Sequence, residues 1–249
     1  MSRILLMTLS LCTVILLNIT ASFYSLNGHT TSEITSRLPL LFLPANYVLL
    51  ICWLLYIMIF FWIFNFKKTF HMMSSAHRNR VTFLFVASCL LHIAWISLWH
   101  FGFFTGTVIT KIALLIVLLT LYVTFPKQEN RMLGRVPFSL LTGWIFITTV
   151  SNISYFLMIH GWTGFGLSDP LWAVIFLTIS TAFALHFMYH YKDYVMNLVF
   201  VWAFIGIAVR NGTEELFISA AAIFLSAVII ACIFLFSSRG ADHKNRVGT

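Results

Sequence analysis

The sequence predicts an all-α polytopic transmembrane helical bundle of about eight spans, and three observations lead to this fold class. The first is composition: of 249 residues, 60% are hydrophobic and 9% are charged, with a mean hydropathy of +0.95. A soluble domain carries about a quarter charged residues, so lipid must be the main solvent of this chain. The second is a series of apolar segments of spanning length, and the third is the placement of basic residues between them.

Each predicted span is an apolar run of the length that crosses a bilayer, about 20 residues. The segments are 4–24, 46–66, 81–103, 107–125, 137–159, 170–189, 194–210 and 214–236. Pro137 and Pro170 fall in the first turn of their segments, where the missing N–H costs little. Segment 4–24, preceded by Arg3, has an alternative interpretation as a cleaved signal peptide, which would leave seven spans.

The basic residues favour one side of the membrane. All but three of the 15 lie in alternate breaks, which an eight-span chain places on the same side: Arg3, Lys67, Lys68, Arg78, Arg80, Lys127, Arg131, Arg135, Lys192, Arg239, Lys244 and Arg246. Arg37, Lys111 and Arg210 are assigned to the opposite side. The positive-inside rule therefore predicts that both termini lie in the cytoplasm, and the basic charge indicates orientation rather than nucleic-acid binding.

The acidic residues and cysteines argue against several classes of chemistry. All seven acids lie in breaks or at predicted helix ends: Glu33, Glu129, Asp169, Asp193, Glu214, Glu215 and Asp242. Proton-driven transporters and carboxylate-based hydrolases usually need an acid at bilayer depth, so neither class is favoured. The four cysteines lie inside apolar runs without a C-x-x-C spacing, so neither a metal site nor a disulfide framework is expected. We expect no catalytic residues.

Three segments present polar and aromatic residues. His92, Trp95 and Trp99 in 81–103 follow the helical spacing, as do Trp144, Thr148, Asn152 and Tyr155 in 137–159; in 46–66, Tyr47 and Tyr56 lie near opposite ends, with Cys52 and Trp53 between them. Spacings of three, four and seven place residues on one helix face. Such a face either packs helix against helix, with indole and amide groups as hydrogen-bonding links, or lines a pocket. Their occurrence on three helices favours a pocket for a flat, aromatic or sterol-like guest.

The same segments carry a family resemblance. VPFSLLTGWIFITTVSN, LHIAWISLWH, PANYV and VWAFIGI (201–207) resemble the TspO/MBR family of tryptophan-rich sensory proteins, and most closely its longer bacterial branch with extra transmembrane helices. The resemblance implies a TspO-like five-helix unit over 1–160, three additional helices over 161–237 and a basic cytoplasmic tail over 238–249. The same resemblance implies a multi-pass protein of the bacterial inner (cytoplasmic) membrane. It also implies a pocket that opens toward the first long break, 25–45, which would act as a lid.

The resemblance implies that porphyrins, haem-related tetrapyrroles or sterols are ligands. Carried over by position, and with His92 of the same face, the implied ligand-binding residues are Tyr47, Trp53, Tyr56, His92, Trp95, Trp99, Trp144, Thr148 and Asn152. Two positions depart from the family, because Cys52 stands where it has tryptophan and His92 where it has asparagine. No Lys or Arg follows Tyr155 in the proposed cholesterol pattern, so sterol binding is not expected.

The function that we expect is non-enzymatic binding of a hydrophobic aromatic ligand, with porphyrin or haem as its leading example, in a sensory or stress-related role. The partners are then the lipid bilayer and a hydrophobic small molecule; a homodimer stays open. The alternative is a transporter of a small uncharged or amphipathic solute. A third interpretation is porphyrin breakdown, for which His92 would be the axial ligand.

Overall fold

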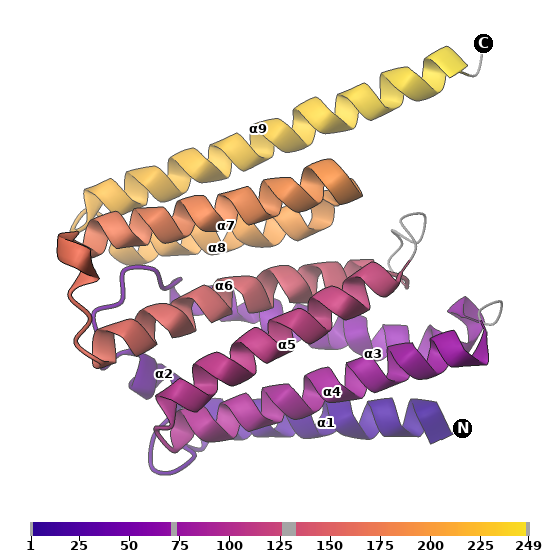
Figure 1. Cartoon of the computed structure of the whole chain (residues 1–249), viewed down its shortest axis with the longest axis horizontal. Helices are drawn as coiled ribbons and strands as arrows, with labels where there is room; N and C mark the ends of the chain where they lie inside the picture. Colours follow the sequence, from indigo (N-terminus) through magenta and orange to yellow (C-terminus); the bar gives the residue numbers. More distant parts are fainter. Residues whose placement is uncertain (1, 71–73, 126–132, 248–249) are drawn as a thin grey trace. The chain divides into compact units, whose positions relative to one another are not determined.

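The computed structural model describes residues 2–70, 74–125 and 133–247. The described helices are α1 Ser2–Phe23, α2 Thr31–Thr35, α3 Ile51–Thr69, α4 Ser75–His100, α5 Phe104–Thr124, α6 Val136–Ile159, α7 Asp169–Tyr191, α8 Tyr194–Asn211 and α9 Leu216–Val247, with 3-10 helices η1 Asn46–Leu50 and η3 Gly164–Gly166 (Figure 1). Eight helical segments of the described residues are long and apolar enough to cross a membrane, and the second of them, Asn46–Phe66, joins η1 to α3; this confirms the predicted all-α bundle of eight spans. Lys127, Glu129 and Arg131 lie outside the described residues.

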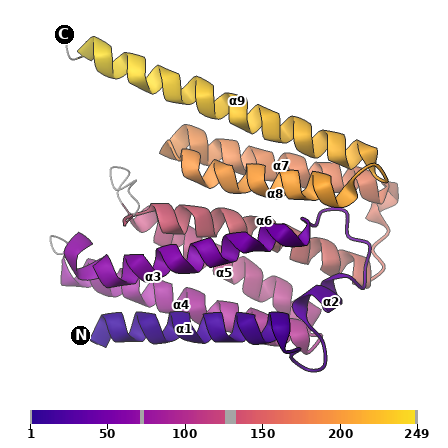
Figure 2. The same ribbon diagram turned by 180° about the vertical axis from the view of Figure 1, so that it is seen from behind.

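The first compact unit comprises Met1–Leu40 and Leu50–Trp162. Its spanning helices close into a ring, in which α1 packs against α4, α4 against α5, α5 against α6, α6 against α3, and α3 against α1. In Figure 1 α4 and α5 face the viewer, whereas Figure 2 shows α1 and α3 in front. Each helix therefore turns one flank toward a shared interior and another toward lipid.

Local sequence signals set the ends of several helices. Ser74 precedes α4 and accepts a hydrogen bond from the backbone N–H of His77, as an N-cap does. Asp193 caps α8 in the same way, through the backbone N–H groups of Val195 and Met196. Pro137 and Pro170 lie in the first turns of α6 and α7, as predicted.

The second compact unit comprises Leu41–Leu49 and Thr163–Thr249. In it α7, α8 and α9 pack against one another in pairs. The segment Leu41–Leu49, which precedes α3 along the chain, runs along α8: the backbone N–H of Ala45 donates to the carbonyl of Gly206 at 3.0 Å. Asn211 Nδ2 donates to the carbonyl of Leu41 at 3.0 Å. Gly206 permits this contact because a Cβ there would collide with Val48.

Candidate functional site

The interior of the five-helix unit contains a small cavity of about 40 Å³. All five helices contribute to its wall, which is formed by Leu11, Val14, Tyr56, Ile59, Phe85, Ser88, Cys89, His92, Leu114, Leu118, Leu141 and Ile145. A cavity of this size holds about two or three water molecules. Ligand pockets for drug-sized molecules measure about 300–1,000 Å³, so a ring ligand requires these side chains to move apart.

Two of the predicted site residues, Tyr56 of α3 and His92 of α4, line the cavity. The Nε2 atom of His92 lies 3.3 Å from Nδ2 of Asn18 on α1. With the amide in this orientation, Asn18 donates and the ring nitrogen accepts. The contact links α1 to α4 and occupies the nitrogen of His92 that points at the neighbouring helix.

The indoles of α4 continue into a connected group of rings. We call His92, Trp95, Trp99, Phe104 and Tyr155 the aromatic cluster. Trp95 stacks on Trp99 at a centroid distance of 5.9 Å, and Trp99 lies 4.7 Å from the ring of Tyr155 on α6. The sequence therefore predicted correctly that His92, Trp95 and Trp99 share a face of α4, and the structure shows that this face meets Tyr155 of α6.

Polar side chains link α5 to α6 beside this cluster. Asn152 Nδ2 donates to Oγ1 of Thr107 at 3.2 Å, and Lys111 Nζ donates to Oγ1 of Thr148 at 3.0 Å. The rings of Phe104 and Tyr155 lie 5.1 Å apart in the same antiparallel register. Predicted residues Thr148 and Asn152 therefore lie at an α5–α6 contact, where they hold polar groups of α5.

The position of Lys111 corrects the sequence analysis, which assigned this residue to the outer side of the membrane. It lies inside α5, seven residues after Phe104, and is 2% exposed. Its Nζ lies 3.9 Å from the ring centroid of Trp95, a cation–π contact. The signal that could have identified it is simple: a charged residue within an apolar segment is a functional hypothesis by default.

Trp144 occupies a different part of α6. It is buried, and its indole lies within hydrogen-bonding range of the Cys52 thiol on α3. This contact joins α3 to α6 and does not involve the aromatic cluster.

Four buried polar atoms around the aromatic cluster have no hydrogen-bond partner: Nε1 of Trp95, Nε1 of Trp99, Oδ1 of Asn152 and the hydroxyl of Tyr155. Buried polar atoms are nearly always hydrogen-bonded, and an orphaned one requires an explanation such as a water or a ligand. Three of the four can donate a hydrogen bond. The cluster therefore presents unused donors next to the Lys111 ammonium.

Two predicted residues lie elsewhere. Tyr47 belongs to the second compact unit, where its ring packs edge-on against Trp202 of α8 at 5.5 Å. Trp53 is 45% exposed and packs edge-on against Tyr56 at 6.3 Å. The one-residue displacement from Cys52 turns Trp53 by about 100° around α3, which takes its ring away from the interior.

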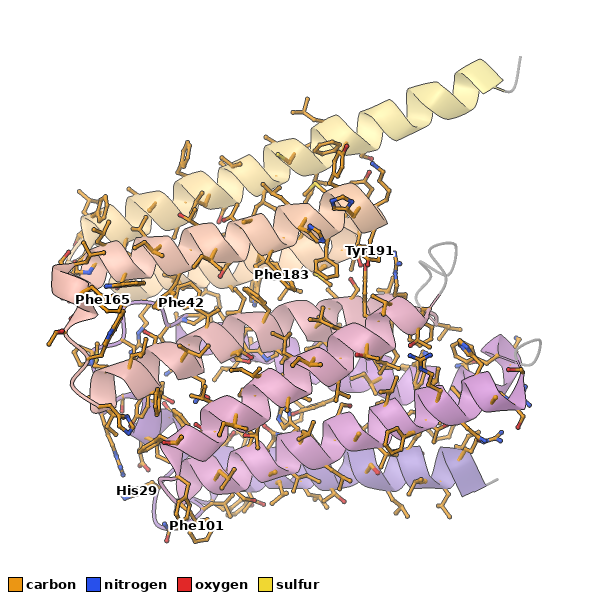
Figure 3. The ribbon with its side chains drawn as sticks, viewed as in Figure 1. His29, Phe42, Phe101, Phe165, Phe183 and Tyr191 are labelled. Atoms are coloured by element: carbon orange, nitrogen blue, oxygen red, sulfur yellow. The ribbon has the colours of Figure 1, made fainter. Side chains whose placement is uncertain are left out.

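The long break predicted as a lid is divided between the two units. Residues up to Leu40 belong to the first unit and Leu41–Leu49 to the second. In the first unit, Asn27 Nδ2 donates to the carbonyl of His100 at 3.1 Å, and Thr31 Oγ1 lies 3.4 Å from His100 Nε2. The segment around α2 therefore covers the end of α4, near His29 and Phe101 in Figure 3.

A capping box orders this segment. Thr30 and Glu33 exchange hydrogen bonds at the start of α2, at 2.7 Å and 3.2 Å. The hydrogen bond from the backbone N–H of Thr30 is the main reason that the pKa of the Glu33 carboxyl lies below its usual value, and the Thr30 hydroxyl adds to the effect.

Neither metal-ligating nor disulfide chemistry is present in the described part of the chain. No group of three or more His, Cys, Asp or Glu side chains there is arranged to hold a metal ion, and Cys12, Cys52, Cys89 and Cys232 are free thiols.

Comparison with known proteins gives one match. The model of the family described as "TSPO-like protein" matches residues 4–235, which reach from α1 into α9. No curated protein and no solved structure matches the chain.

Proposed function

From the premise that this chain belongs to the TSPO-like protein family, we propose that its five-helix unit binds a hydrophobic aromatic ligand. The ligand that we expect is a tetrapyrrole such as protoporphyrin, which is bound and released and is not a resident cofactor. The role is sensory or stress-related and involves no catalysis. The protein is a multi-pass membrane protein, so an apolar ligand can reach it from the lipid phase.

The observation that carries this proposal is the set of unpartnered polar atoms on the aromatic cluster. Trp95, Trp99 and Tyr155 offer large apolar ring faces, and each holds a donor that no protein group accepts. Aromatic side chains with a polar tip suit a guest that is flat and apolar but carries a few acceptors. A tetrapyrrole has this combination, with ring nitrogens and carboxylates on a planar body.

Binding requires the interior to open. The cavity of about 40 Å³ lies in the centre of the ring of helices, and its wall is mostly apolar. The segment around α2 is attached to α4 by the contacts of Asn27 and Thr31 with His100. Release of these few hydrogen bonds would uncover the end of α4, so we propose that the ligand enters on this side.

We further propose that the membrane is the bacterial inner membrane and that both termini lie in the cytoplasm. Arg3, Arg78, Arg80 and Lys192 lie at the helix ends that an even number of spans places on the side of the amino terminus. The positive-inside rule assigns that side to the cytoplasm. The segment around α2 would then face outward.

The first test is titration of the purified protein with protoporphyrin while tryptophan quenching is followed. Trp95→Phe and Trp99→Phe keep an aromatic ring but remove the N–H donor. Each variant should weaken binding about fivefold, as expected for the loss of one hydrogen bond. Trp172→Phe, which changes an indole of α7 bonded to the Gly164 carbonyl, should bind as the parent does. Equal affinities in all four proteins would disprove a site at the aromatic cluster.

The two alternatives predict different measurements. A transporter would give solute-dependent flux across proteoliposomes, whereas a binding protein would not. Porphyrin breakdown with His92 as axial ligand would require a haem spectrum that His92→Ala abolishes. We favour binding over breakdown because Nε2 of His92 already contacts Asn18.

A further inference from the structure

Lys111 is a buried cation without an acidic partner among the described residues. Its ammonium contacts the Thr148 hydroxyl and the ring of Trp95, both of which are neutral. The other titratable groups that act on it are the Cys52 thiol and the His92 ring, and neither is a carboxylate. The cost of removing an ammonium from water is several kcal/mol, and two neutral contacts offset only part of it. A buried charge in a membrane protein is normally paired, so a counter-ion is missing.

The direction of the lysine side chain supports a role in the interior. A lysine in a spanning helix usually extends along the helix toward the interface, where its charge meets water. Side chains tilt toward the amino terminus of their helix, and in α5 that is the direction of the nearer end. The Lys111 ammonium instead contacts Thr148 of α6 and the ring of Trp95 of α4, inside the bundle. Lys111 and Thr148 lie seven positions, about 10 Å, from the level at which Phe104 meets Tyr155.

The ammonium also lies at one end of the cavity. Leu114 and Ile145 belong to the cavity wall, and each is three residues along its helix from the Lys111–Thr148 contact. Three residues correspond to about one turn. On the side of the Lys111–Thr148 contact where the cavity lies, the wall is almost entirely apolar. On the other side lie the unpartnered donors of the aromatic cluster, and the ammonium stands between the two. An apolar chamber that ends in a cation and hydrogen-bond donors fits a molecule with an acid group on an apolar body.

We propose that Lys111 binds the carboxylate of the ligand, and that the ligand class is therefore hydrophobic carboxylic acids. The inference rests on the proposed function, because it assigns one anchoring contact within the same site. The carboxylate supplies the charge partner that the ammonium lacks, Thr148 positions the ammonium, and Trp95 covers it with its ring. Two sources of this chemistry are available to a membrane protein: the carboxylates of a tetrapyrrole and that of a fatty acid.

The experiment uses two matched pairs of ligands with the full-length protein in detergent. Protoporphyrin is compared with its dimethyl ester, and 9,10-dibromostearate with its methyl ester, with tryptophan quenching as the readout. Within each pair the apolar body is unchanged and the negative charge is removed. The parent protein should bind the acid of at least one pair about tenfold to a hundredfold more tightly than the ester, as expected for a charge-assisted hydrogen bond.

Lys111→Met keeps the length of the side chain and removes the charge. It should bind the ester as tightly as the parent does and should lose the preference for the acid. Lys192→Met removes a lysine at the end of α7 and should keep the preference. Because Lys111→Met removes an unpaired buried charge, we expect it to fold; Thr148→Val provides a second variant, which should reduce the preference by mispositioning the ammonium.

The outcomes separate the two proposals. If acid and ester bind equally well in both pairs, or if Lys111→Met keeps the preference of the parent, the carboxylate anchor at Lys111 is wrong while ligand binding stands. If none of the four ligands binds saturably, the proposed function itself is wrong. Preference confined to the dibromostearate pair would support the anchor and overturn the tetrapyrrole, and preference confined to the porphyrin pair would support both.

Discussion

The polar side chains inside the five-helix unit that have hydrogen-bond partners find them in two ways. Most hydroxyls bond back to their own helix, as Thr149 does to the carbonyl of Ile145 at 2.6 Å. A few side chains reach across to another helix instead: Lys111 to Thr148, and Asn152 to Thr107. Lipid offers no alternative partner, so such cross-helix bonds persist, and each contributes about 0.6 to 2 kcal/mol. These residues fix the helices around the site.

A residue-scale prediction concerns the capping box of α2. The pKa of Glu33 is lower in the folded protein than its unfolded value of 4.5. The ionised carboxylate therefore stabilises α2 fully above pH 4.5, and this stabilisation is lost as the pH falls through the lower, folded pKa. Hydrogen exchange of the backbone amides of 30–36, corrected for intrinsic rates, should therefore lose protection in acid. Glu33→Gln keeps the hydrogen-bonding pattern but cannot ionise, so its protection should not show this step. The same step in both proteins would contradict the assignment.

At the scale of elements, close packing between chain segments depends on where the helices carry glycine. In α8, Gly206 accepts a backbone hydrogen bond from Ala45 and leaves no room for a Cβ against Val48. In α5, a Cβ at Gly106 would lie 3.2 Å from the Cδ1 atom of Leu98, the flexible end of a side chain. A Cβ at Gly206 would therefore meet a rigid neighbour, Val48, whereas a Cβ at Gly106 would meet the flexible end of Leu98.

This difference gives a matched pair of variants. Gly206→Ala should lower the free energy of unfolding by about 1–3 kcal/mol, because overpacking pushes the segment Leu41–Leu49 off α8. Gly106→Ala should change the free energy of unfolding little. Leu98 can move aside, and the cost of this movement is offset by the preference of a helix for alanine over glycine, which is about 1 kcal/mol. Thermal unfolding in detergent measures both. Addition of Val48→Ala should rescue Gly206→Ala, and failure of this rescue would show that another contact limits the substitution.

At the scale of the whole molecule, the eight spans fall into a five-helix unit and a three-helix unit. Each unit has its own packing, and the chain passes from the first to the second after Leu40, returns at Leu50, and leaves again after Trp162. Segment Leu41–Leu49 is therefore part of the three-helix unit although it precedes α3 along the chain.

The whole-molecule prediction is the orientation in the membrane. Ser32 is an exposed residue of α2, which follows the first span, and Lys192 follows α7, the sixth span. An odd and an even number of crossings place the two residues on opposite sides of the membrane. A membrane-impermeant maleimide added to intact cells should label Ser32→Cys, whereas Lys192→Cys should react only after permeabilisation. The four natural cysteines lie within spanning helices, so the unmodified protein is the control. The reverse labelling pattern would overturn the assignment of both termini to the cytoplasm.

The sequence by itself determined the number and approximate positions of the spans, because the bilayer imposes a length and a hydropathy that each segment must meet independently. The helix ends were less well determined: α4 begins at Ser75 rather than at Val81. The sequence also determined which residues share a helix face, since His92, Trp95 and Trp99 follow the helical period. Only the tertiary structure decided which faces meet. Trp99 contacts Tyr155, while Tyr47 packs against Trp202 and Trp53 remains half exposed. Lys111 became a candidate anchor only when its neighbours Thr148 and Trp95 were known, because the partners of a buried charge lie on other helices and helical periodicity carries no information about them.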